Sequence, residues 1–146
     1  MSERVVLLPP GHSRPIGRYS PGLVISPQAE GRFVFVSGQV ATDDQGCVLA
    51  PGDPGTQAEI VFERIESVLA EAGGGLGDLV SVVVYLVDRA HFEAVSAVRN
   101  RVLSEPAPTS TVIVAARLAE EGCLVEISGI AVVTGEHRKE ASWTSP

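Results

Sequence analysis

The chain has 146 residues, a formal net charge of −7 and an isoelectric point near 4.9. Its length fits a single domain with one hydrophobic core, and its acidity argues against a nucleic-acid or anionic-membrane surface, because both need a basic stripe. The sequence has no basic cluster and no long apolar segment, so we expect a cytoplasmic protein that neither binds nucleic acid nor enters a membrane.

The first half of the chain predicts short strands and a proline-rich loop. Residues 4–8 predict a first strand, and residues 15–22 read as an irregular loop that prolines and glycines hold. Residues 23–26 and 32–39 then look like two paired strands. Gly38, in the second of them, marks a point where the backbone comes close to another group.

Two helices and one central strand follow. The pair Asp53-Pro54 predicts a helix start, with aspartate as the cap and proline at the first helical residue, and glycines 73–75 predict its end. Residues 79–87 are apolar at nearly every position, which is typical of a strand covered on both faces. Asp88 then predicts the cap of a second helix.

The last apolar segment predicts a hairpin with one misplaced charge. Its strands are expected at residues 109–115 and 124–133, and Glu126 lies between two apolar residues of the second. One interpretation is an exposed glutamate paired with Arg117 across the turn. The other is a carboxylate kept for chemistry, because a carboxyl group in a pocket can both give and take a proton.

The order of these elements predicts an α+β domain with both helices on one face of a mixed sheet. The other face then lacks a cover, so we expect a second subunit on it and an oligomer. Residues 1–134 are expected to form this single domain. The polar segment 135–146 is expected to be a disordered tail, in which Trp143 is either expendable or a plug against a neighbour.

Neither cysteines nor histidines suggest a metal site. Cys47 and Cys123 have no CxxC spacing, which fits a reducing compartment without disulfides. The three histidines, His12, His91 and His137, are scattered without ligand spacing, so we expect no bound metal.

Several motifs occur together in an order that resembles a known family. The segments PIGRYS, FVFVSGQ, EAGGGLGDLVSVVVYLVD, HFEAVSAVRN, PTSTVIVA and LVEISGIAVV resemble the RidA/YjgF family over residues 15–133. The resemblance implies a chorismate-mutase-like α+β fold with a mixed six-stranded sheet, two helices on one face, and a homotrimer around a central barrel. It also implies pockets between subunits and a cofactor-free hydrolysis of enamines or imines, such as 2-aminoacrylate, to a keto acid and ammonia.

The resemblance carries over three functional residues. Tyr19 matches the pocket tyrosine of the family, and Gly38 matches the glycine whose backbone lines the pocket, with Ser37 beside it. Ser37 lacks the GxSxG context of a serine nucleophile, so we expect it to line the pocket. Glu126 matches the glutamate thought to position water. We expect Glu126 and Tyr19 to move protons, and the substrate to be a small molecule.

Other pocket positions depart from the family. Ser110 replaces the arginine that grips the substrate carboxylate, Val112 replaces a cysteine, and Ser96 replaces an asparagine of the second helix. A hydroxyl cannot reproduce the two-pronged grip of a guanidinium. Arg18 stands where the family has proline and could return a positive charge. We therefore expect a substrate that is larger or lacks the usual carboxylate.

Three functions remain open at this point. The first is hydrolysis of an enamine or imine, which needs only a pocket, a water and a proton-transfer group. The second is a pathway-specific cyclisation, dehydration or tautomerisation in specialised metabolite biosynthesis, because the replacements make the pocket wider and less polar. The third is a non-catalytic trimer that binds a metabolite or a protein partner.

Overall fold

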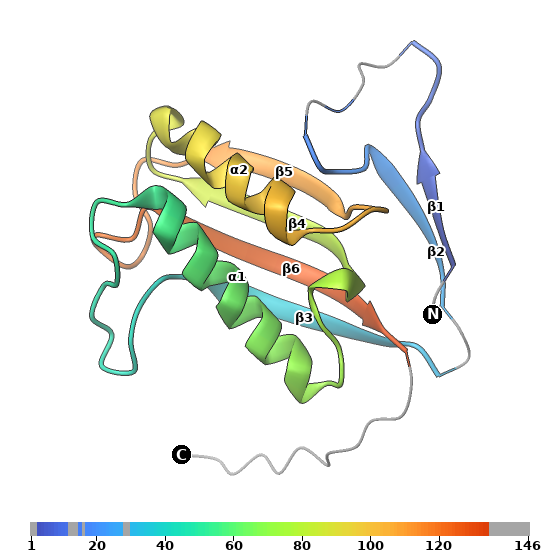
Figure 1. Cartoon of the computed structure of the whole chain (residues 1–146), viewed down its shortest axis with the longest axis horizontal. Helices are drawn as coiled ribbons and strands as arrows, with labels where there is room; N and C mark the ends of the chain where they lie inside the picture. Colours follow the sequence, from blue (N-terminus) through green and yellow to red (C-terminus); the bar gives the residue numbers. More distant parts are fainter. Residues whose placement is uncertain (1–2, 12–14, 16, 28–29, 135–146) are drawn as a thin grey trace.

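The computed structural model describes residues 3–11, 15, 17–27 and 30–134. This part of the chain folds as predicted into an α+β domain with two α-helices packed on a mixed sheet (Figure 1). The predicted tail at 135–146, with Trp143, lies outside the described residues. No helix within the described part is long and apolar enough to cross a membrane.

The main sheet has four strands in the order β3-β6-β4-β5. The β4–β5 pair is parallel, whereas β3–β6 and β4–β6 are antiparallel, so the sheet is mixed. Strand β4 is central, as its apolar sequence predicts, and β3 and β5 form the two edges (Figure 1). The four strands are β3 (Arg32–Gln39), β4 (Leu79–Leu86), β5 (Thr109–Val114) and β6 (Val125–Val133).

Both helices cover one face of this sheet (Figure 1). Helix α1 (Pro54–Glu71) begins at the predicted cap, where Oδ1 of Asp53 accepts a hydrogen bond from the Thr56 N–H at 3.0 Å. Hydrogen bonds from Thr56 lower the pKa of Asp53, because they favour the ionised carboxylate. Helix α2 (Phe92–Val102) follows a short 3₁₀ turn that Asp88 caps through the Ala90 N–H.

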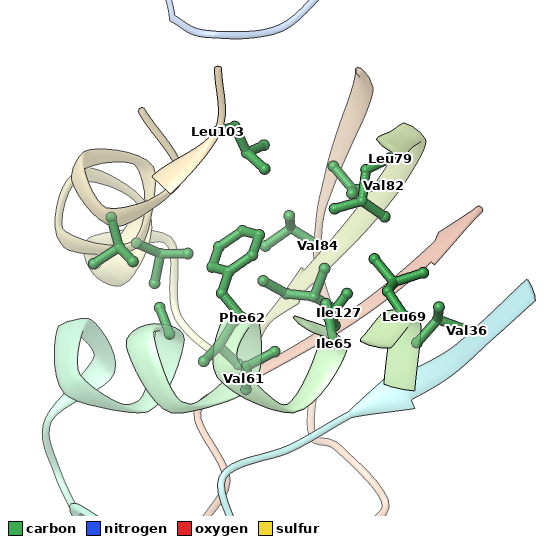
Figure 2. Close-up of a cluster of buried hydrophobic side chains, with 14 of the residues drawn as sticks. Val36, Val61, Phe62, Ile65, Leu69, Leu79, Val82, Val84, Leu103 and Ile127 are labelled. Carbon is green, nitrogen blue, oxygen red and sulfur yellow. The ribbon is translucent and has the colours of Figure 1, made fainter. Parts of the chain in front are cut away.

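The core lies between the helices and the sheet, with Phe62 of α1 near its centre (Figure 2). The strands send alternate side chains into it, as a pleated sheet with one buried face requires. The outer face of the sheet is apolar and open by contrast: Phe33 is 61% exposed and Phe35 74%. Buried residues that Figure 2 labels are Val36, Val61, Phe62, Ile65, Leu69, Leu79, Val82, Val84, Leu103 and Ile127.

The six strands form two sheets, and the expectation of one six-stranded sheet is wrong in this respect. Strand β2 (Gly22–Ser26) was expected to pair with β3 but pairs with β1 (Glu3–Leu7) in a separate hairpin, to the right of the main sheet in Figure 1. Strand β3 pairs with β6 instead. This partner lets Val34 and Val36 of β3 face the core next to alternate residues of β6.

The expected hairpin of the last two strands is also wrong. Strand β4 lies between β5 and β6 and bonds to both. The apolar sequence of β4 explains the difference, because a strand with apolar residues on both faces is best placed between two neighbours. The segment between β5 and β6 is therefore a crossing connection rather than a tight turn.

Candidate active site

Strand register places Glu126 on the outer face of the sheet, away from the helices. Val84 and Ile127 are opposite each other and both buried in the core. The next pair along, Tyr85 and Glu126, points to the other face, because successive residues of a strand alternate. Glu126 is half-buried there.

The side chain of Glu126 lies directly over Gly38. A Cβ atom added to Gly38 would lie 2.6 Å from Oε2 and 2.8 Å from Cδ of Glu126. Real Cβ contacts are longer than this, so only glycine leaves room for the carboxylate. The close backbone approach that the sequence predicts at Gly38 is therefore found, and Glu126 is the group that approaches.

Glu126 has no partner inside the part of the chain that the structure describes. It forms no hydrogen bond or ion pair with any described residue, so the alternative pairing with Arg117 is not formed. Its carboxylate oxygens are free to accept protons or hydrogen bonds from a ligand or water. A half-buried carboxylate of this kind is a candidate acid or base.

A shallow hollow of about 250 Å³ lies on the same outer face. Ser37 lines it together with Ser81 and Ser128 from the two central strands, and the rest of the lining is mostly apolar. Ser37, Gly38 and Glu126 thus share one face of the sheet. We call Gly38 and Glu126 the outer-face pair.

Cys123 does not add a nucleophile to this face. Burial raises the pKa of its thiol, and the nearby carboxylates of Glu120 and Glu126 raise it further. The thiol is only 3% exposed. A buried, protonated thiol is a poor nucleophile, so thiolate chemistry is not supported.

The remaining predicted site residues lie on the helix face. Ser110 is opposite Val82 in β4 and Val112 is opposite Val84, and both β4 residues are buried under the helices. Val112 packs against the core. With Ser96 and Arg99 of α2 it lines a narrow hollow that has no room for a water molecule.

Arg99 lies beside Ser110 on this helix face, and it was not among the predicted site residues. It is 4% exposed. Its Nη1 lies 3.3 Å from Oγ of Ser110, and its guanidinium carbon lies 5.6 Å from the ring centroid of Tyr19. Its position could have signalled this, because residue 99 falls on the same helical stripe as the buried Val95. We call Tyr19, Arg99 and Ser110 the Arg99 group.

The loop that carries Tyr19 is bound to the start of β5. Ser20 donates its N–H to the carbonyl of Pro108 at 3.0 Å, and its hydroxyl donates to the carbonyl of Ala107. The N–H of Arg18 donates to Oδ1 of Asn100 at 2.8 Å. These bonds hold Tyr19 over Arg99.

The side chain of Arg18 does not face Glu126. Its Nη1 donates to the carbonyl of Leu103 at 3.1 Å, and its Nε lies 3.9 Å from Oε1 of Glu105. Arg18 is therefore engaged at the C-terminal end of α2. The positive charge beside Ser110 comes from Arg99 instead.

The predicted site residues thus form two groups on opposite faces of the sheet. The outer-face pair comes from β3 and β6, whereas the Arg99 group lies on the helix side at the β5 edge. No small ligand can touch both groups of one chain, because the sheet separates them. Among the described residues, no three His, Cys, Asp or Glu side chains gather to hold a metal ion.

Comparison with known proteins identifies the family. The sequence pattern of the family described as Endoribonuclease L-PSP matches residues 11–133. A RutC family protein of Pyrococcus abyssi is 34% identical over 118 residues, which cover 81% of this chain and 88% of the relative. The chain belongs to the RidA/YjgF family. The resemblance that the motifs suggest is thereby confirmed.

Solved structures of this family share the fold. RidA from an Antarctic Psychrobacter species is 33% identical with a TM-score of 0.64, over 82% of this chain and 92% of that one. A Rid family protein of Yersinia pestis, called YyfB and of unknown function, is 24% identical with a TM-score of 0.75, over 89% and 98% of the two chains. The second likeness shows the fold alone.

Proposed function

We propose that this RidA/YjgF protein is a cofactor-free hydrolase that converts an enamine or imine into a carbonyl compound and ammonia. The observation that carries the proposal is the carboxylate of Glu126, which lies over Gly38 without a partner in the described part of the chain. A carboxylate that no cation or donor of its own chain occupies is available to a water molecule or a substrate.

The chemistry needs only this group and water. An enamine first gains a proton on carbon and loses one from nitrogen, and so becomes an imine. Water then adds to the imine carbon, and Glu126 takes one water proton and passes it to nitrogen. Glu126 then takes the proton of the new hydroxyl and passes it to the same nitrogen, and the carbon–nitrogen bond breaks, so that ammonia leaves and a carbonyl remains. The net change is addition of one water and loss of one ammonia.

A homotrimer would complete the site. Phe33 and Phe35 leave the outer face of the sheet apolar and open, and a second subunit is a fitting cover for such a face. The neighbour's Arg99 group, with its Tyr19 ring, would then lie beside the outer-face pair. Tyr19 would serve as a hydrogen-bond donor to the bound substrate. Two unpaired thiols, Cys47 and Cys123, support a reducing, cytoplasmic location.

The test is an imine-hydrolysis assay with a matched charge control. An amino-acid oxidase generates imines from a panel of amino acids, and keto-acid formation is followed with the wild type and with Glu126→Gln. We expect the wild type to accelerate hydrolysis and the variant to lose about a hundred-fold or more. Glu66→Gln removes the same charge from the exposed face of α1, and it should keep full activity.

Two results would overturn the proposal. An acceleration that survives in Glu126→Gln would remove the proposed role of this carboxylate. No acceleration with any imine would favour a pathway-specific acid/base enzyme, or, if keto acids still bind, a non-catalytic metabolite-binding trimer.

A further inference from the structure

Arg99 is a buried cation without an anionic partner among the described residues. Its three described hydrogen bonds go to neutral oxygens, namely Oγ of Ser110 at 3.3 Å and Oδ1 of Asn100 at 3.4 Å from both Nε and Nη2. These distances exceed the 2.9 to 3.0 Å that is usual for N–H···O bonds. The guanidinium donors are therefore only loosely engaged.

A buried charge of this kind is costly unless something compensates it. Burial lowers the pKa of Arg99, but an arginine still keeps its proton. The C-terminal end of α2 offers only a partial negative charge. The acidic side chain on this side, Glu105, accepts the N–H of Ala107 at 3.1 Å and faces Arg18, so it does not neutralise Arg99.

The surroundings of Arg99 fit a single small anion. Ser110 adds a hydroxyl beside Nη1, and the ring of Tyr19 borders the guanidinium on another side. Both residues are half-buried, whereas Arg99 itself is 4% exposed, so a ligand reaches the guanidinium at the β5 edge only by displacing part of this cover. One planar guanidinium matches one carboxylate, which accepts two parallel N–H bonds.

We propose that Arg99 is the specificity-determining residue of the site and binds a carboxylate of the ligand next to Ser110. The substrate is then an imine or enamine derived from an amino acid, and its carboxylate is held from α2 instead of from position 110. This assignment of substrate class rests on the proposed function, whereas carboxylate binding by Arg99 does not. It replaces the expectation, drawn from Ser110 alone, that the ligand lacks a carboxylate.

Binding can be measured without any reaction. Titration calorimetry compares aliphatic 2-oxo acids with the matching neutral 2-oxo amides on the wild type, Arg99→Lys, Arg99→Gln and Arg101→Gln. We expect the acid to bind at least tenfold more tightly than the amide, Arg99→Lys to keep part of this preference, and Arg99→Gln to lose it. Arg101→Gln removes a positive charge from the exposed side of the same helix, and it should keep the preference.

If Arg99 serves packing alone, its substitution should weaken the binding of both ligands or of neither. That result would overturn the inference. Equal binding of acid and amide by the wild type would do the same without any variant, so an Arg99→Gln protein that fails to fold leaves the test intact.

The second readout is the rate on paired imines that differ only in the carboxylate. An amino-acid oxidase supplies the imine of leucine, and an amine oxidase supplies the imine of 3-methylbutylamine. We expect the wild type to prefer the leucine imine, and Arg99→Gln to lose ten- to hundred-fold in kcat/KM on it alone.

The two proposals fail in different ways. Acceleration of both imines that depends on Glu126 but is indifferent to Arg99 would overturn the carboxylate assignment and keep the hydrolase. Tight binding of 2-oxo acids through Arg99 without acceleration of either imine would overturn the hydrolase and keep the carboxylate site.

Discussion

Gly38 is the residue on which the position of Glu126 depends. In Gly38→Ala, the new methyl group would meet Oε2 and Cδ of Glu126 at less than 3 Å, so the carboxylate must turn away. We predict a loss of imine-hydrolysis activity of about a hundred-fold, because a catalytic group displaced by about 1 Å costs this much. Steady-state kinetics measures it.

Gly77→Ala is the matched control, because a methyl group there meets nothing within 4 Å. It should keep full activity. Full activity in Gly38→Ala would mean that Glu126 does not act from the position seen here, since the substitution displaces the carboxylate without removing it.

Sequence alone could locate one half of the candidate site better than the other. Gly38 and Glu126 break the patterns of their strands, a glycine and a charge in apolar runs, and such exceptions are visible without a structure. Arg99 gives a weaker signal: it falls on the helical stripe of the buried Val95, but an arginine near the C-terminal end of a helix is ordinary. Its burial depends on the loop that covers it, and this contact spans about 80 residues of sequence.

At the scale of elements, Gln57 joins α1 to two distant segments. It is fully buried. Its Nε2 donates to the carbonyls of Leu49 and Gly122 at 3.2 and 3.3 Å, and its Oε1 accepts the N–H of Leu124 at 2.8 Å. This amide supplies hydrogen-bond partners to backbone groups of two loops that lie outside the helices and strands.

We predict that Gln57→Met destabilises the fold by about 2 to 3 kcal/mol, because it leaves buried backbone groups without partners while it keeps the side-chain volume. Urea unfolding at one fixed protein concentration measures the change, since an oligomer's stability depends on concentration. Glu66→Met, on the exposed face of the same helix, should change stability by less than about 0.5 kcal/mol. An equal effect of the two substitutions would contradict this role of Gln57.

Local sequence signals predicted most of the helices and strands, but they did not predict which strands pair. The start of α1 at Asp53 and the central place of β4 follow from a cap and from continuous apolarity, which are properties of short segments. The partner of a strand depends on competition among distant strands. For this reason β3 was assigned to β2 rather than β6, and β5 to β6 rather than β4.

At the scale of the whole molecule, the two groups of site residues lie on opposite faces of one sheet. Glu126 faces outward, whereas Arg99 contacts Ser110 on the helix side. If both groups act on one ligand, they must come from different subunits. In a ring of three identical subunits, each subunit would give its Arg99 group to one neighbour and its outer-face pair to the other.

Co-expression of two strongly impaired variants tests this arrangement. Arg99→Gln and Glu126→Gln subunits, produced in equal amounts, should recover about a quarter of the wild-type activity on amino-acid-derived imines, because in a ring of heterologous interfaces one site in four receives an intact residue from each side. Sites that lie within one subunit would recover nothing, because every subunit carries one of the two defects. Wild type co-expressed with the double variant distinguishes the cases again, with about a quarter of the activity for shared sites and about half for sites within one subunit. No recovery in the first mixture, together with about half of the activity in the second, would mean that Arg99 and Glu126 do not act together across a subunit interface.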